Sequence, residues 1–279
     1  MQKKLIAVAI AGALAAPVAI ADVAVSGSIR TGVEYTGSEW QVADNYSRLR
    51  FKSSSDLGNG QSAYMGYEFR VDSAKGSIVT GNTQRLSYVG IKGDWGSLSL
   101  GSQWSTLFNT VGTFIDKSHR FGGVGYWGNG GGQYRMKDSV AFTTQAGPVW
   151  LQADAQMNAG GDDLDRTSIG GTFAVGGASI GAAWQDNGSA DFTGVGVSMG
   201  LAGLALSGGF TDVSGVGSGY GITGSIAGVR LAYEDSDSYA DPQVWGNYAI
   251  GLGGGAKAII ELMNDGTDTA GIGMLRMDF

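Results

Sequence analysis

The chain has no cysteine, only three prolines and a single histidine among its 279 residues. Without cysteine, no disulfide framework can hold an exported chain together. Proline interrupts hydrogen-bonded strands, so its scarcity favours a protein built from many of them. Acidic residues outnumber basic ones, 25 against 18, which argues against nucleic acid as a partner.

Long hydrophobic runs are also missing after residue 21, so we do not expect a helical membrane protein. The start of the chain differs. Two lysines precede an apolar, alanine-rich stretch that ends in the small-x-small cleavage pattern of residues 19–21. We expect residues 1–21 to be a cleaved signal peptide. An N-terminal anchor helix is the alternative, and the shortness of the stretch disfavours it.

Glycine is abundant, with 50 residues, and apolar and polar side chains alternate with a period of two. In segment 22–35, one face carries Val25, Ile29 and Val33, whereas Arg30 lies on the other. This pattern is typical of a half-buried β-strand, in a soluble β-sandwich as well as in a membrane barrel. The number and spacing of the segments distinguish these two folds.

Sixteen such segments can be counted, which leads us to predict an all-β fold for residues 22–279. We expect a transmembrane antiparallel β-barrel of about 16 strands with an open lumen. A glycine-rich β-helix is the alternative, but no fixed nine-residue calcium-binding repeat is present. The predicted strands are 22–35, 45–54, 61–71, 83–92, 96–104, 133–144, 148–158, 165–175, 177–187, 191–200, 203–213, 218–227, 229–236, 242–250, 254–264 and 268–279.

The connectors support the barrel. Those after even-numbered segments are brief and rich in glycine, and the long ones follow odd-numbered segments. Short turns at one end and longer loops at the other are expected of an outer-membrane barrel. The long connectors are 36–44, 72–82, 105–132 and 159–164.

Arginines recur on the predicted lumen face. Leu49 and Phe51 share one face of their segment, which places Arg48 and Arg50 on the other. A basic wall beside water costs little and creates a field across the lumen. Scattered solubilising charge is the alternative, but the opposite faces of the same segments carry almost no charge.

Two later segments continue this wall. Leu86 and Tyr88 share a face in segment 83–92, so we expect Arg85 to point into the lumen. By the same reasoning, Arg135 points inward from between its two apolar neighbours.

The connector 105–132 is too long for a plain turn. Irregular backbone at membrane depth is tolerated where it lines a water-filled cavity, so we predict an inward-folded constriction loop. A disordered external loop is the alternative, and the aromatic residues of the connector favour packing instead. The residues that we expect at the constriction are Asp116, His119, Arg120, Phe121, Gly122 and Gly123.

Several motifs together resemble the general porins of Gram-negative outer membranes. They are the segments 46–52, 85–93 and 96–103, the Phe-Gly-Gly of residues 121–123, and the terminal Phe279. The resemblance spans residues 22–279, with specific motifs in 22–137 and only the architecture beyond them.

This resemblance implies a homotrimer of sixteen-stranded barrels, each narrowed where wall arginines face acids on an inward loop. Arg48, Arg85 and Arg135 match the wall arginines. Phe279 matches the assembly signal read by the barrel-assembly machinery, and the surrounding partners would be outer-membrane lipid and lipopolysaccharide.

One departure from the family pattern concerns the loop. Porins of this family usually carry acids on both sides of Phe-Gly-Gly, but this chain has Arg120 before it and Val124 after it. Asp116 is the remaining acid upstream in the loop. We therefore expect a more basic constriction, which puts a preference for cations in doubt.

The expected function is a water-filled channel in the cell outer membrane for passive diffusion of small hydrophilic solutes and ions. Two alternatives remain: a solute-selective channel of the same fold, and a non-conducting structural barrel. The short external loops argue against an adhesin.

A barrel enzyme would need a nucleophile or an activated water beside a base, usually histidine. The single histidine, His119, has no Ser or Asp partner at strand spacing, so we expect no enzyme. We also expect no cofactor. The acidic clusters within 162–165 and 235–241 could hold calcium, but no EF-hand spacing supports a metal site.

Overall fold

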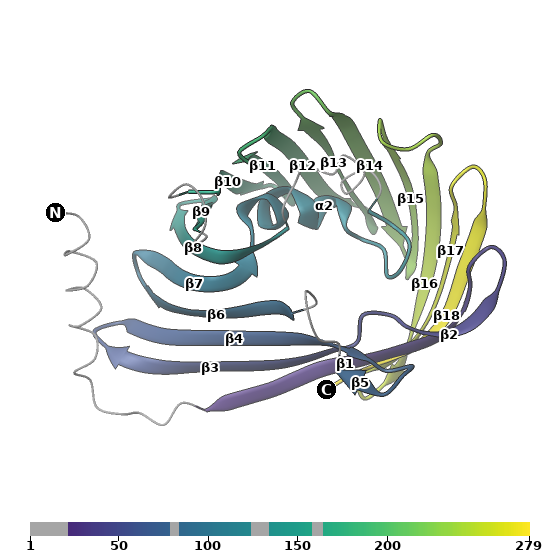
Figure 1. Cartoon of the computed structure of the whole chain (residues 1–279), viewed down its shortest axis with the longest axis horizontal. Coiled ribbons are helices and arrows are strands. Elements are labelled where there is room, and N and C mark those ends of the chain that lie inside the picture. The colour runs from purple at the N-terminus through teal and green to yellow at the C-terminus, as the bar shows by residue number, and fades with distance from the viewer. Residues whose placement is uncertain (1–21, 79–83, 124–133, 158–163) are drawn as a thin grey trace.

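The computed structural model describes residues 22–78, 84–123, 134–157 and 164–279, which form one closed antiparallel sheet (Figure 1). The predicted signal peptide and residues 124–132 of the predicted loop lie outside the described residues. The strands are β1 (Val23–Tyr35), β2 (Trp40–Asp44), β3 (Arg48–Gly58), β4 (Gln61–Asp72), β5 (Ser77–Ile78), β6 (Gln84–Gly93), β7 (Gly96–Trp104), β8 (Arg135–Ala146), β9 (Val149–Gln156), β10 (Arg166–Val175), β11 (Ala178–Asp186), β12 (Asp191–Leu201), β13 (Leu204–Val213), β14 (Gly217–Ile226), β15 (Val229–Ser236), β16 (Gln243–Gly253), β17 (Ala256–Asn264) and β18 (Thr269–Asp278).

These 18 described strands occupy sixteen strand positions around the barrel, which confirms the predicted fold. β2 and β3 pair with successive halves of β1, so together they occupy one strand position. The two-residue β5 pairs only with β4 and does not add a position. Between β2 and β3, Tyr46 has a φ of 58°. The predicted strand 45–54 is therefore wrong at its start, because this left-handed conformation interrupts the ladder.

The barrel closes where the last strand meets the first. β18 pairs with β1 along eight residues of each strand, and the terminal Phe279 continues this pairing. The N–H of Gly27 donates to the Phe279 carbonyl at 2.8 Å, and the N–H of Phe279 donates back to Gly27 at 3.2 Å. Closure satisfies the backbone groups that an open sheet edge would expose.

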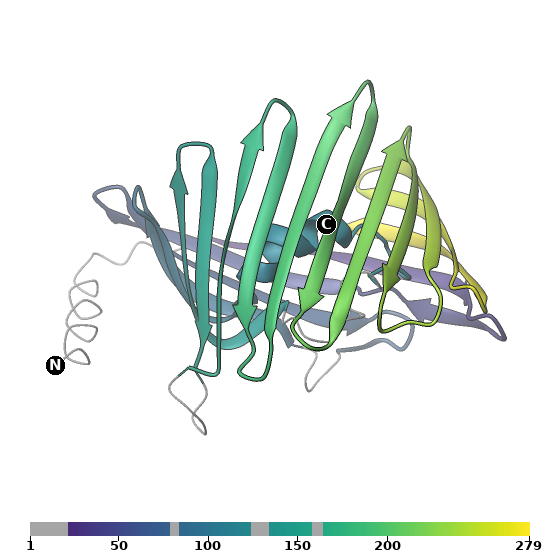
Figure 2. The same ribbon diagram turned by 90° about the horizontal axis from the view of Figure 1, so that it is seen from above.

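The two ends of the barrel differ, as the connectors predicted. At one end, seven two-residue turns join β3 to β4, β6 to β7, and each later even-numbered strand from β8 to β16 to its successor. The other end carries the longer connectors, which include the one between β7 and β8. Figure 2 shows the two-residue turns of the later hairpins along one rim of the barrel.

The two faces of the sheet differ in polarity. Ile222, Leu231 and Leu275 are 56%, 62% and 65% exposed on the outer face. On the inner face Gln185 and Glu261 are fully buried. An apolar exterior around a polar interior is the pattern of a β-barrel in lipid.

The segment after β7 turns into the barrel instead of away from it (Figures 1 and 2). It contains one π-helical turn, η2 (Phe108–Gly112), and one α-helical turn, α2 (Thr113–Ile115). Leu107, Val111 and Ile115 form a buried cluster with residues of β11, β12 and β13. Among the described residues, no helix is long and apolar enough to cross a membrane.

Candidate functional site

Four glycines form a row on the inner face of the barrel. Gly181, Gly196, Gly209 and Gly221 are successive cross-strand partners on β11, β12, β13 and β14. Directly opposed residues of antiparallel strands share a face, so all four face the interior. We call this set the glycine row.

The inward segment packs onto the glycine row. A Cβ at Gly196 would collide with the Phe114 ring, and one at Gly209 or Gly221 would lie 3.0 Å from Ile115. Only glycine lets a neighbouring backbone and its side chains approach a sheet so closely. The row is therefore a seat for η2 and α2.

A buried aspartate holds the beginning of the segment. The Thr106 backbone N–H and hydroxyl both donate to Oδ2 of Asp154 on β9, at 2.5 and 2.7 Å. Gln152 donates to the same oxygen at 3.0 Å, and Ser168 donates to Oδ1. A carboxylate with several donors fixes the direction in which the chain leaves β7.

A buried glutamate on β17 holds the other end of the segment. Glu261 accepts hydrogen bonds from the backbone N–H groups of His119, Arg120 and Phe121 at 2.7, 2.6 and 2.9 Å. The Asn247 amide also donates to it at 2.9 Å. Its negative charge thus meets three aligned backbone donors.

Glu234 on β15 anchors the Phe-Gly-Gly motif in the same way. It accepts from the Gly123 N–H at 2.7 Å and from the Trp245 indole at 2.7 Å. Glu234 is also the cross-strand partner of Gly221, so this anchoring carboxylate lies directly beside the glycine row.

Arg120 explains the departure from the family's loop pattern. It forms a bidentate pair with Glu34 on β1, with Nε–Oε1 and Nη2–Oε2 distances of 2.6 and 3.0 Å. Its guanidinium also lies 6.0 Å from the ring centre of Tyr46. The acids that bind the loop tip therefore stand on the barrel wall, and the loop supplies the donors.

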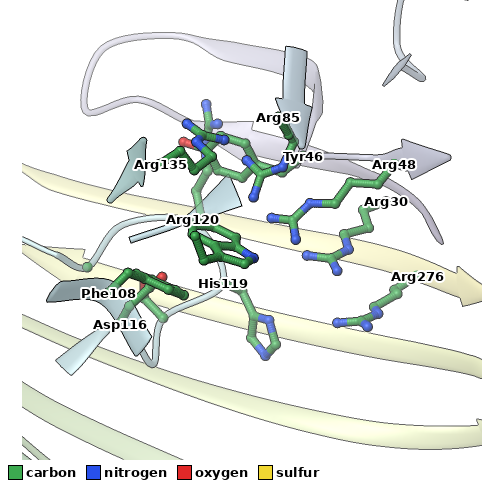
Figure 3. A pocket seen from close by; sticks show the side chains of 13 residues that line it. Arg30, Tyr46, Arg48, Arg85, Phe108, Asp116, His119, Arg120, Arg135 and Arg276 are labelled. Atoms are coloured by element: carbon green, nitrogen blue, oxygen red, sulfur yellow. The ribbon is translucent and has the colours of Figure 1, made fainter. Parts of the chain in front are cut away.

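A cavity of about 600 Å³ lies between this segment and the opposite wall (Figure 3). Six arginines line it, and we call it the arginine cavity. Asp116 is the one carboxylate among its described lining residues. The six are Arg30, Arg48, Arg85, Arg120, Arg135 and Arg276.

Three of these arginines have carboxylate partners. Glu68 binds the Nε of Arg85, Glu34 binds Arg120, and Asp278 binds Arg276 at 2.8 Å. The other three form no ion pair with any described residue, and we call them the unpaired arginines. They are Arg30, Arg48 and Arg135. Glu68 acts on Arg48 and Arg135, and Asp278 on Arg30, only from beyond ion-pair distance, so their positive charge is offset in part.

Arg85 reaches the cavity through a β-bulge. The β4–β6 register shifts between Glu68 and Phe69, which leaves Arg85 as the extra residue. Leu86 and Tyr88 then lie on the inner face, where they line a cavity with Glu68. The prediction that they point outward is wrong, because the bulge changes the phase of the alternation.

The prediction that Tyr134 and Met136 lie on the outer face is also wrong. Their exposed fractions are 3% and 0%, and Tyr134 packs with Leu107 under the inward segment. Asp138 has a φ of 47° and the β7–β8 register shifts beside it, so the alternation changes phase here too. Arg135 nevertheless lines the arginine cavity.

The structure thus brings together most of the site residues named from the sequence. Arg48, Arg85, Arg135, Asp116, His119, Arg120 and Gly122 all line the arginine cavity. Others lie elsewhere. Arg50 pairs with Glu68 beside a different cavity, Phe121 packs against Ile259 and its neighbours, and Gly123 binds Glu234.

Five residues of the site were not predicted to lie at the constriction, although alternation placed Arg30 on the polar face of its segment. They are Arg30, Arg276 and the three anchoring glutamates, Glu34, Glu234 and Glu261. The two arginines meet because β1 and β18 close the barrel. The glutamates do carry a signal, since each falls at an inward position of its strand, but alternation gives no indication of what they bind.

Burial changes the proton affinities of two loop groups. It raises the pKa of the Asp116 carboxyl, an effect that Arg48, Lys117 and Arg85 oppose. It lowers the pKa of His119, against the attraction of Glu261. The imidazole is therefore neutral near pH 7, since an ordinary histidine has a pKa of about 6.5.

No group of three or more metal-ligating side chains occurs among residues 22–78, 84–123, 134–157 and 164–279. Part of the acidic cluster within 162–165 lies outside the described residues. The backbone N–H of His119 donates to Glu261, and its ring faces the arginine cavity (Figure 3).

Comparison with known proteins identifies the family. A family model described as Gram-negative porin matches residues 7–251. The chain belongs to this family. Gram-negative porins are outer-membrane proteins, so the apolar exterior of this porin barrel faces lipid.

Curated relatives match part of the porin. The major outer membrane protein P.IB of Neisseria gonorrhoeae is 39% identical over 126 residues, which cover 39% of this chain and 34% of that protein. The protein of the same name from Neisseria lactamica is 36% identical over 126 residues and 35% of its length. The chain thus spans about a third of the length of the curated relatives it matches.

Solved structures agree with the porin fold. An anion-selective porin from Comamonas acidovorans has a TM-score of 0.77 at 17% identity, over 93% of this chain and 100% of that one. OmpF of Salmonella typhi, in complex with daunomycin, has a TM-score of 0.75 at 14% identity, over 92% and 97%. At these identities the likeness establishes the fold alone.

Proposed function

We propose that this porin forms a water-filled channel for passive diffusion of small hydrophilic solutes and ions across the outer membrane. A barrel with sixteen strand positions is wide enough for an aqueous interior. The inward segment reduces this interior to a narrow passage beside the arginine cavity, and residues 105–123 act as the constriction loop.

We further propose that the channel favours anions. The observation that carries this is the charge of the arginine cavity, which has six arginines and one carboxylate among its described lining residues. Three of the six have no carboxylate partner. Fixed charge at a narrow point biases which ions enter, even though the whole chain has a net charge of −7.

The test is conductance across a planar lipid bilayer. The purified protein should add discrete conductance steps in KCl, and the reversal potential in a KCl gradient should indicate chloride preference. This preference should fall as salt is raised, because the Debye length shrinks from about 10 Å at 0.1 M to about 3 Å at 1 M. Insertion without conductance steps would leave the non-conducting barrel as the better function.

The assembly proposals rest on narrower support. The barrel is proposed to form a homotrimer, as one solved structure of Vibrio cholerae OmpT is described as a trimer form. Closures in groups of three in the current trace would support it. Phe279 is proposed as the signal for the barrel-assembly machinery, and lipopolysaccharide as the lipid around the loop end.

We propose no enzymatic activity and no cofactor. The imidazole of His119, the one histidine, faces a cavity lined by arginines, and the porin family is a family of channels. Hydrolysis assays on lipid and peptide substrates would test this directly.

A further inference from the structure

Another polar cavity lies in the lumen, apart from the arginine cavity and from the cavity beside Glu68. Its volume is about 310 Å³, and it is lined by the ends of β12, β13, β14 and β15 near their two-residue turns. Lys117 of the constriction loop and Arg230 of β15 supply two positive charges. We call this cavity the hydroxyl niche.

Hydroxyl groups form the floor of the niche. Ser198, Ser207 and Thr223 are successive cross-strand partners on β12, β13 and β14. Ser225 continues the floor one step along β14, opposite Arg230. All four line the niche, and none donates a hydrogen bond to another described residue, so their hydroxyls are available to a solute.

The positive charges of the niche are also available. Neither Lys117 nor Arg230 forms an ion pair with a described residue. Arg230 donates one N–H to the Lys117 carbonyl, and this hydrogen bond joins the two cationic residues across the niche. A guanidinium has five donors in all, so four remain.

The niche adjoins the passage through the barrel. Asp116 and Ser118 line the arginine cavity, whereas Lys117 between them lines the niche. The loop is therefore the partition between the two cavities. Since short turns mark the periplasmic end of such barrels, the niche is on the periplasmic side of the constriction.

We propose that the hydroxyl niche binds a small solute that carries both an anionic group and several hydroxyls, of the chemical class of sugar phosphates. Lys117 and Arg230 would bind the anionic group, and the four side-chain hydroxyls would exchange hydrogen bonds with the hydroxyls of the sugar. This inference rests on the proposed channel function and names a preferred solute class for it.

Blockade of the KCl current by three probes tests the niche: glucose 6-phosphate, inorganic phosphate and glucose. Glucose 6-phosphate should half-block the current at about one-tenth of the phosphate concentration, since charge and hydroxyl contacts combine. Glucose alone should not block measurably. Equal blockade by glucose 6-phosphate and phosphate would overturn the inference.

Two variants assign the effect to the niche. Lys117→Gln removes a charge but leaves the backbone carbonyl that Arg230 binds, and it should raise the half-blocking concentration about tenfold. The pair Ser207→Ala and Thr223→Val should abolish the advantage of glucose 6-phosphate over phosphate. Lys52→Gln, an equal loss of charge on β3, is the matched control and should leave blockade within about twofold of the original.

The outcomes separate the two proposals. A protein that adds no conductance in KCl removes the channel function, and the niche with it. A protein that conducts but shows no dependence on Lys117, or on Ser207 and Thr223, retains the channel function and loses only the hydroxyl niche.

Discussion

The arginine cavity and the glycine row lie on opposite sides of the constriction loop, and their chemistry is opposite. The arginine side leaves room, because long charged side chains surround a cavity of about 600 Å³. The glycine side leaves no room, because its residues have no side chain and η2 and α2 pack directly against the backbone of the sheet. In the proposed channel, the arginine side would bias which ions pass, whereas the glycine row positions the loop.

This division separates selectivity from pore size. Wall charges such as Arg48 and Arg135 can change without moving the loop. The loop is held by the glycine row, by the carboxylates Asp154, Glu234 and Glu261, and by the pair of its own Arg120 with Glu34. Glycines on the other side can change only if the loop moves. The two walls should therefore give different signatures when mutated.

The largest effect is expected from the glycine row. In Gly196→Val the new side chain takes the place of the Phe114 ring, and overpacking of this kind costs roughly 1–3 kcal/mol. The loop should leave its seat, with larger and noisier single-channel conductance. Gly200→Val on the same strand is the control, because a Cβ there has no neighbour within 4 Å. Conductance that is equally raised in both variants would contradict the seat.

A smaller effect on the loop is expected from Glu261→Gln. The amide keeps one oxygen for the backbone donors of residues 119–121 but loses the charge and the second oxygen, at a cost of about 1–3 kcal/mol. Hydrogen exchange of these three amides should accelerate, while the barrel strands keep their protection. Glu39→Gln, at an exposed loop position, serves as control. Unchanged exchange at residues 119–121 would remove Glu261 as the anchor.

The same two walls show what a sequence can reveal. The strand of residues 96–104 has the bounds that were predicted for it, because alternation and the following loop are local signals. Alternation also placed Arg48 in the lumen. The glycine row has no local signal, since Gly181, Gly196 and Gly209 become neighbours only through the register of separate hairpins.

Irregular backbone accounts for most of the remaining differences. The bulge at Arg85 and the positive φ values of Tyr46 and Asp138 each shift the alternation, and no residue type at these positions announces a shift. Barrel closure is the other cause, because it brings Arg276 to the same cavity as Arg30 from the far end of the chain. Such features depend on the closed sheet and not on any one segment.

Neutralising the arginine side should change ion preference and leave the loop in place. Arg48→Gln together with Arg135→Gln removes two unpaired charges, so the reversal potential should shift toward cations. Conductance steps should keep nearly the original size in concentrated KCl, where charge is screened. Arg50→Gln is a poor control because Arg50 binds Glu68, so Lys52→Gln is preferred. An unshifted reversal potential would place the two arginines outside the ion path.

The smallest effect expected is a pH dependence from Asp116. Because the pKa of this carboxyl is raised, it takes up a proton at a higher pH than an ordinary aspartate, whose pKa is about 3.9. As the pH falls through the raised pKa, the arginine cavity loses the negative charge of Asp116, so chloride preference should increase. The change is small because one carboxylate stands against six arginines.

Two variants separate Asp116 from the neighbouring imidazole. Asp116→Asn should show the stronger chloride preference already at neutral pH and lose most of the response to acid. His119→Gln should keep the part of the response that comes from Asp116, because that carboxyl is unchanged. Since the lowered pKa of His119 moves its own protonation into the acidic range, any loss of response in this variant measures the contribution of the imidazole. If acid strengthens chloride preference equally in both variants and in the original protein, the titrating group lies elsewhere, and the charge of the loop does not reach the ion path.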